Sequence, residues 1–160
     1  MIQKLVRERQ HRLPPECYHG LLIVHFTACI KNKVSFFTTQ QIFNSIEEIL
    51  LDVLPDFHVD AEVYLFMPDH CHLLLKGTEE TSDVLKCMNK FKQKSGYWLS
   101  QRNLEIRWQK DFYDHILRRE EDKEKLIWYI LNNPVRKDLV ESWKEYPYKG
   151  STCYDFNEWD

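Results

Sequence analysis

Two histidines one residue apart, His70 and His72, stand at the head of an apolar run that continues to Leu75. Side chains two positions apart on a β-strand point to the same face of a sheet. Both imidazoles can therefore face one metal ion, while Cys71 points the other way into packing. The spacing indicates half of a coordination shell, although such a pair also arises by chance in many chains.

A helix in the last third of the chain carries two further groups with suitable chemistry. It is predicted to begin at the acidic residues 120–122, which suit the positive end of a helix, and to end before Pro134. Tyr129 and Asn133 fall together at one edge of its apolar stripe. Asn133 offers an amide oxygen for a hard cation, and Tyr129 offers a phenol oxygen one turn away. The alternative is a core-edge aromatic and an asparagine that faces water. The stripe consists of Leu126, Ile127, Ile130 and Leu131.

The remaining pattern predicts the elements that must position these groups. Strands are expected at about 19–30, 58–66, 70–76 and 106–117, and helices at about 40–53, capped by Thr39, and from a cap at Thr81 or Ser82 to about 101. This order, with the extra helix, predicts an α+β fold of the ferredoxin-like split βαβ type. Such a fold is a sandwich of an antiparallel sheet with two helices on one face. The other face is free for a metal ion and a substrate, and the extra C-terminal helix, which carries Tyr129, is available to lie over it.

The length of 160 residues suits a single domain, expected to span residues 1–160 with a basic arm at 1–18 and a tail at 135–160. No run of 18 apolar residues occurs and the N-terminus is charged, so we expect no membrane span and no secretory signal. The five cysteines include no Cys-x-x-Cys pair, which favours reduced thiols. A cytoplasmic, nucleoid-associated protein is expected.

The net charge of -3 argues against a protein that coats nucleic acid by bulk electrostatics. The charge is unevenly distributed, because residues 86–110 are strongly basic whereas residues 47–62 carry six acids and no Lys or Arg. Tyr97 and Trp98 interleave with the basic residues, as a surface that stacks bases would need. The alternative for each lysine is an ordinary solvated helix face. The candidate DNA contacts are Lys90, Lys92, Lys94, Arg102, Arg118 and Arg119, with the arm from Lys4 to Arg12.

Three separated segments, residues 67–75, 108–118 and 128–136, together resemble the single-tyrosine HUH transposases. Within that superfamily the chain is most similar to the REP-associated tyrosine transposases, domesticated relatives of small insertion-sequence transposases. The resemblance covers about residues 19–150 and includes Trp143 in the tail. It implies a ferredoxin-like fold, which agrees with the predicted order of elements.

The resemblance also implies a role for each matching residue. His70 and His72 match the metal ligands of the family. Asn133 matches the polar third ligand, and Tyr129 matches the nucleophile. Asp69 stands where many relatives have Asn, and it adds a negative charge near the metal.

The implied reaction is cleavage and transfer of single-stranded or hairpin DNA through a covalent 5′-phosphotyrosine. Two imidazoles and an amide oxygen suit Mg²⁺ or Mn²⁺, which would neutralise the phosphodiester and orient it for in-line attack. Lys125, one turn before Tyr129, would favour the phenolate by its charge. Insertion-sequence relatives pair as homodimers whereas REP-associated relatives look monomeric, so both states are open.

Two other classes of function are considered from the residues. His25-Phe26-Thr27 has the form of one two-histidine phosphoesterase motif, but that class needs a second His-x-Thr/Ser motif, and the second pair here is His70 with His72. The other alternative is a catalytically inactive nucleic-acid-binding domain of the ferredoxin-like type. It would need aromatic residues on the central strands, and Tyr64 and Phe66 are a modest match.

Overall fold

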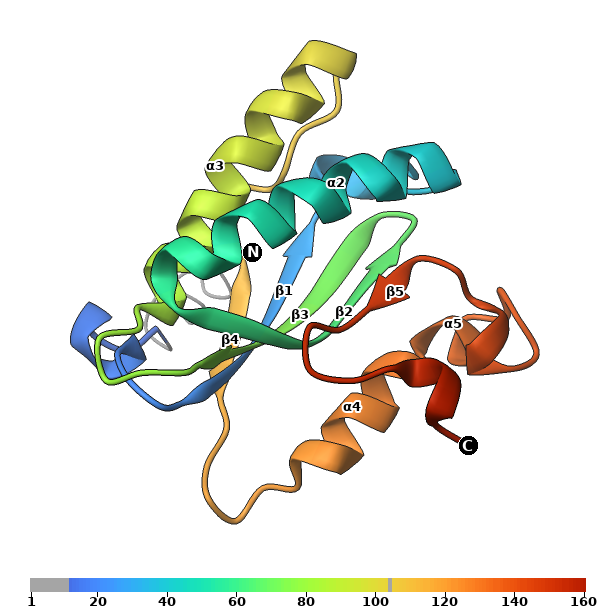
Figure 1. Ribbon diagram of the computed structural model, residues 1–160. Coiled ribbons are helices and arrows are strands. Elements are labelled where there is room, and N and C mark those ends of the chain that lie inside the picture. The colour runs from blue at the N-terminus through green and yellow to red at the C-terminus, as the bar shows by residue number, and fades with distance from the viewer. Residues whose placement is uncertain (1–11, 104) are drawn as a thin grey trace, which may run out of the picture.

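The computed structural model describes residues 12–103 and 105–160 of the chain. One antiparallel sheet with the strand order β4-β1-β3-β2-β5 lies at its centre (Figure 1). The strands are β1 (Ile23–Cys29), β2 (Val59–Met67), β3 (His70–Gly77), β4 (Tyr113–Ile116) and β5 (Lys149–Gly150). The α-helices are α2 (Gln40–Val53), α3 (Val84–Arg102), α4 (Lys123–Leu131) and α5 (Asn133–Arg136). Short 3-10 helices lie at Pro15–Tyr18, Lys31–Lys33, Leu54–Phe57, Trp143–Glu145 and Phe156–Glu158.

The predicted ferredoxin-like arrangement is confirmed. Helices α2 and α3 cover one face of the sheet, and α4 and α5 lie on the opposite side together with the C-terminal segment (Figure 1). The short strand β5 extends the sheet beyond β2. In the part of the chain that the structure describes, no helix is both long and apolar enough to cross a membrane.

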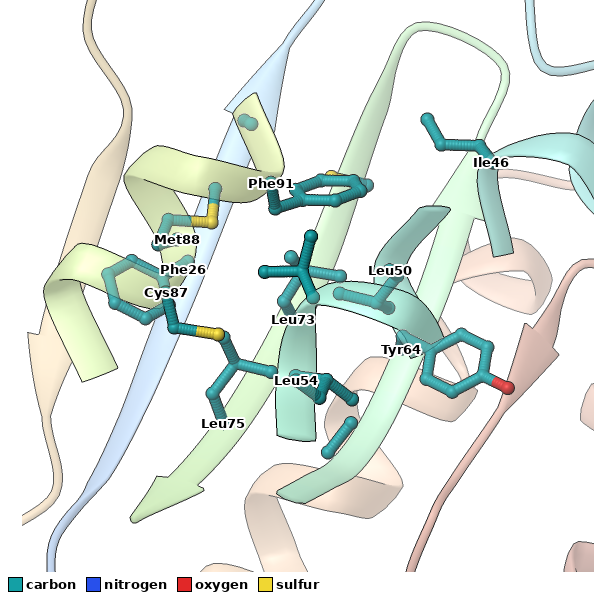
Figure 2. Packing of buried hydrophobic residues seen from close by; sticks show 14 of the residues in the cluster. Phe26, Ile46, Leu50, Leu54, Tyr64, Leu73, Leu75, Cys87, Met88 and Phe91 are labelled. Atoms are coloured by element: carbon teal, nitrogen blue, oxygen red, sulfur yellow. The ribbon is translucent and has the colours of Figure 1, made fainter. Parts of the chain in front are cut away.

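The face covered by α2 and α3 holds the larger of two apolar cores. Leu50 of α2, Phe91 of α3 and Leu73 of β3 meet there (Figure 2). Cys71 is fully buried in the same core. Because side chains alternate across a strand, this fixes the two flanking histidines on the opposite face.

The second core attaches α4 to the face that carries the histidines. Leu65 and Met67 of β2 and Leu74 of β3 pack there against Ile127 and Ile130 of α4. The predicted apolar stripe of this helix is therefore its buried side. This packing holds the tyrosine-bearing helix over the sheet.

The N-cap of α3 differs from the prediction. Asp83 caps this helix, and its carboxylate accepts a hydrogen bond from the Lys86 N–H at 2.9 Å. Ser82, one of the two predicted caps, is fully buried and donates instead to the His58 carbonyl at 2.6 Å. The predicted cap of α2 is confirmed, since Thr39 accepts from the Ile42 N–H at 3.2 Å.

The last of the predicted strands is much shorter than expected. Residues 106–117 were expected to be extended, whereas only Tyr113–Ile116 pair along β1. Trp108 turns its indole into the helix-covered core and donates to Ser95 Oγ at 2.9 Å, so this stretch makes only an isolated bridge to Ile30. Trp108 is therefore held by its contacts in the core and not by a continuous ladder of hydrogen bonds with β1.

The first strand also begins later than predicted. The expectation was residues 19–30, but Gly20 adopts a φ of 97° and its N–H bonds to the Ser82 carbonyl, so extended pairing starts at Ile23. Most of the predicted basic arm, residues 1–11, lies outside the described residues. Arg12 at its end is used within the fold, since its Nη2 donates to the Phe112 carbonyl at 2.7 Å.

Candidate active site

The two histidines lie at the start of β3, directly after the Pro68-Asp69 turn from β2. His72 is 8% exposed, and the side chain of His70 is 19% exposed. Their rings meet edge to face with centroids 5.0 Å apart. The strand therefore presents both imidazoles side by side on one face, with one rim still open to solvent.

Asn133 reaches this pair from the other end of the chain. Its Nδ2 atom lies 2.7 Å from His72 Nε2 and 3.5 Å from His70 Nε2. The residue is 6% exposed, so it faces the histidines and not water. Three side chains whose segments are about sixty positions apart in the sequence thus converge on one point.

The backbone reaches this arrangement in a way that the helical periodicity did not predict. Tyr129 and Asn133 were expected on one continuous helix, but α4 ends at Leu131 and Asn133 opens the separate helix α5. Pro134 occupies the first turn of α5, where an N–H has no partner within the helix. Asn132 therefore marks a break, and the break sets the direction in which Asn133 points.

The outer nitrogens of both imidazoles also have partners. His70 Nδ1 lies 2.7 Å from Asp69 Oδ1. An ionised carboxylate only accepts, so His70 donates this hydrogen bond from Nδ1 and its Nε2 faces Asn133. His72 Nδ1 lies 3.0 Å from His25 Nε2 and 3.3 Å from Thr27 Oγ1. The negative charge that Asp69 adds near the candidate centre is therefore held against a specific ring nitrogen.

Burial keeps the inner histidines neutral. It lowers the pKa of His72 to about 3, together with smaller electrostatic contributions from the neighbouring His25, His70 and Arg136. Burial likewise lowers the pKa of His25 to about 4, with a smaller contribution from His115. Neutral imidazole is the form that binds metal ions, so His72 is ready to act as a ligand at neutral pH.

This set of groups fits a hard divalent cation. Two imidazole nitrogens and one amide face a common point, and the amide oxygen is the atom that a cation would take. Mg²⁺ and Mn²⁺ accept such donors and keep further positions for water or phosphate. Among residues 12–103 and 105–160, no group of three or more His, Cys, Asp or Glu side chains could hold a metal ion. The amide of Asn133 is the third group that the structure brings to this point.

Tyr129 lies on α4 with 56% of its surface exposed. The guanidinium of Arg136 lies 3.9 Å from the centre of its ring, and Arg136 Nη2 donates to the Tyr129 carbonyl at 2.7 Å. The phenol is thus at the surface, beside a cation that the sequence analysis missed. Helical spacing could not have indicated this contact, because the helix was expected to end before Pro134 and Arg136 belongs to the separate helix α5.

Lys125, the cation expected next to Tyr129, is exposed on α4. Its backbone N–H bonds to the capping carboxylate of Asp122 at 3.2 Å. Within the described part of the chain, the charged group in contact with the Tyr129 ring is Arg136. A supporting role for Lys125 remains a prediction.

The predicted DNA contacts separate into two groups. Lys92 is used within the fold, since its Nζ donates to the carbonyls of Gln109 and Lys110 at 2.7 and 3.0 Å. Burial lowers the pKa of Lys92. The side chains of the other candidates are exposed, namely Lys90, Lys94, Arg102, Arg118 and Arg119. Helix α3, which carries the first three of these, lies on the face of the sheet opposite α4 (Figure 1).

A cavity of about 490 Å³ opens beside His70. Its walls include Thr27 and Asp69, and two lysines, Lys33 and Lys137, contribute to its lining. Sequence reasoning missed both lysines, because they lie far apart in the chain and outside the basic stretch at 86–110. They place positive charge around the space next to the histidines.

The strand with two histidines, the asparagine that contacts them and the exposed tyrosine four positions before that asparagine are the residues that the sequence resemblance singled out. The family model described as "Transposase IS200 like" matches residues 19–133, well over half of the chain. The chain therefore belongs to the IS200-like transposase family. The matched region includes both histidines, Tyr129 and Asn133.

Within this family the chain is similar to REP-associated tyrosine transposases. A putative REP-associated tyrosine transposase of Haemophilus influenzae is 24% identical over 144 residues, which cover 77% of this chain and 76% of the relative. The solved structure of a REP-associated tyrosine transposase bound to a REP hairpin superposes with a TM-score of 0.73 at 22% identity, covering 87% of this chain and 80% of that one. A putative transposase from Deinococcus radiodurans R1 gives a TM-score of 0.53 at 18% identity, with 72% and 92% covered.

Proposed function

We propose that this protein cleaves and rejoins single-stranded DNA at hairpins with Tyr129 as the nucleophile. A divalent ion, Mg²⁺ or Mn²⁺, is held by His70, His72 and Asn133. The observation that carries the proposal is the approach of Asn133 Nδ2 to His72 Nε2 (2.7 Å) and His70 Nε2 (3.5 Å), because donors from two distant segments meet at one point. Membership of a transposase family supports the same reaction class.

The reaction is an exchange of one phosphodiester for another. Tyr129 Oη attacks phosphorus in line with the bond to the 3′ oxygen. The Oη–P bond forms, the P–O3′ bond breaks, and the phenol loses a proton while the departing 3′ oxygen gains one. A divalent ion, when bound, supplies neutralisation of the charge on the phosphate oxygens. The products are a 5′-phosphotyrosine and a free 3′-hydroxyl.

Rejoining follows the same path in reverse. A 3′-hydroxyl attacks the phosphotyrosine and restores the free phenol of Tyr129. No nucleotide cofactor is needed, because the covalent intermediate retains a phosphodiester linkage. The exposure of Tyr129 suits this role, since both an outgoing and an incoming strand must reach its oxygen.

The substrate is proposed to be a hairpin with a single-stranded flank. The related protein of known structure was bound to a REP hairpin. The flank can enter the cavity beside His70, where Lys33 and Lys137 would pair with its phosphates. The exposed basic residues proposed to contact the remaining DNA are Lys90, Lys94, Arg102, Arg118 and Arg119.

The test is covalent capture from a pool of single-stranded DNA hairpins with randomised flanks, incubated with the protein and Mn²⁺. We expect a protein–DNA adduct that survives denaturation and is absent in Tyr129→Phe. It should also be absent in His70→Ala and when EDTA is added. Hairpin binding without any adduct would instead indicate the catalytically inactive DNA-binding domain.

A further inference from the structure

The motif His25-Phe26-Thr27 is left unused by the proposed reaction. Phe26 points into the helix-covered core, so His25 and Thr27 lie on the face of the sheet that carries His72. The His25 and His72 rings lie with their centroids 5.2 Å apart, and their planes are inclined by 33°. His25 Nε2 is 3.0 Å from His72 Nδ1.

Counting protons fixes the direction of this hydrogen bond. The Asn133 amide nitrogen lies 2.7 Å from His72 Nε2 and can only donate, so Nε2 of a neutral His72 is an acceptor and the ring proton sits on Nδ1. His72 Nδ1–H then needs an acceptor. His25 Nε2 at 3.0 Å is the nearer one, and Thr27 Oγ1 at 3.3 Å is the other.

We propose that His25 is a positioning residue that accepts the His72 Nδ1 proton and holds His72 in the tautomer whose Nε2 is free for the divalent ion. The inference rests on the proposed metal centre. The two histidine ligands then have different hydrogen-bond acceptors. His70 donates to the carboxylate of Asp69, whereas His72 donates to the neutral imidazole of His25. Outer partners of this kind orient a metal ligand and fix its tautomer.

A matched pair of substitutions tests the acceptor itself. His25→Gln keeps an oxygen near the place of Nε2, whereas His25→Asn is polar but too short to reach His72. We expect Mn²⁺ affinity, titrated by electron paramagnetic resonance on the DNA-free protein, to fall about 10- to 100-fold in His25→Asn. In His25→Gln it should stay within about 3-fold of the wild-type value, as expected when one acceptor replaces another. His19→Asn is the control, since His19 is a surface histidine that pairs with Asp83 at 3.1 Å.

The tautomer can be observed without any metal. Nitrogen-15 shifts of His72 in the metal-free protein should show the proton on Nδ1 in the wild type and in His25→Gln. In His25→Asn the population should shift toward the Nε2 tautomer, because only the contacts with Asn133 and Thr27 then still favour the proton on Nδ1. The inference is overturned if a folded His25→Asn protein keeps wild-type Mn²⁺ affinity, or if His25→Gln loses as much as His25→Asn. Failure of the metal centre looks different, because the wild type and His70→Ala would then bind Mn²⁺ equally weakly.

Discussion

Asp69 illustrates how one residue changes the chemistry of the centre. Its carboxylate lies 2.7 Å from His70 Nδ1, at the position where the resemblance led us to expect Asn in many relatives. A carboxylate partner makes the imidazole a stronger electron donor than a neutral amide partner does. In the proposed metal centre, the negative charge of Asp69 would therefore act through His70.

The first prediction concerns this carboxylate. Asp69→Ala should weaken Mn²⁺ binding about 10- to 100-fold, because His70 loses the acceptor that fixes its ring. Asp69→Asn keeps an acceptor without the charge and should fall between Asp69→Ala and the wild type. Calorimetric titration with Mn²⁺ measures both. Equal affinity in all three proteins would show that the carboxylate does not act through His70.

The second prediction is a loss of stability in acid. Burial lowers the pKa of His72 to about 3 and of His25 to about 4, while both titrate near 6.5 in the unfolded chain. Above pH ~6.5 the two states bind the same protons at these sites. As the pH falls from ~6.5 toward about 4, these histidines bind protons in the unfolded state but not in the folded state. The free energy of unfolding therefore decreases.

Each of these two histidines should lower the free energy of unfolding by about 1.4 kcal/mol for each pH unit of acidification between pH ~6 and ~4.5. Urea unfolding in the presence of EDTA at several pH values measures the slope. His72→Gln removes one titrating group and should give a shallower slope. An identical slope in that variant would contradict the assignment.

At the scale of elements, α4 is anchored to the sheet by a buried charge as well as by apolar packing. Glu62, next to an irregularity in β2, is 1% exposed. Its Oε1 lies 3.2 Å from Nζ of Lys123, the first residue of α4, and 3.9 Å from Lys76 Nζ. Oε2 is buried and has no hydrogen-bond partner among the described residues. The ion pair fixes the start of the helix that carries Tyr129.

The third prediction follows from that ion pair. Lys123→Met should lower the free energy of unfolding by about 1–2 kcal/mol, because it leaves a buried carboxylate with only the more distant Lys76 as a cation. Glu62→Gln combined with Lys123→Met should recover part of the loss. Chemical denaturation provides the measurement. A double variant less stable than Lys123→Met would contradict the explanation.

The elements also show what the sequence could and could not predict. Hydrophobic periodicity located every main strand and helix, because burial of one face is a local pattern. It misjudged the end of the tyrosine helix, since the break at Asn132 depends on how Asn133 and Pro134 pack. It overextended the last strand, because Trp108 leaves the sheet for a tertiary contact with Ser95. The support of His72 by His25 also escaped prediction, because it exists only once β1 pairs with β3.

At the scale of the whole molecule, the sheet separates two tasks. One face is packed by α2 and α3 and supplies most of the apolar core. The other face carries the histidines and α4. The cavity beside His70 on this face is lined by the positive charges of Lys33 and Lys137 and by the carboxylate of Asp69. His70, His72 and Asn133 meet within a single chain. A second copy is therefore not needed to assemble the proposed ligand set.

The fourth prediction is that each chain acts without a residue from a second copy. Mixing Tyr129→Phe with His70→Ala should not restore adduct formation, because we propose that each chain supplies both its own metal ligands and its own nucleophile. The readout is the denaturation-resistant adduct with hairpin DNA. Recovery of adduct in the mixture would show that Tyr129 acts on the centre of a partner copy.

The most direct test of the central claim is mass-spectrometric mapping of the adduct formed with hairpin DNA and Mn²⁺. After digestion with nuclease and protease, we predict a nucleotide attached through its 5′ phosphate to the peptide that contains Tyr129. The same attachment should be missing when Asn133→Ala replaces the wild type. An adduct on any other residue, or one formed equally well in Asn133→Ala with EDTA, would contradict the account.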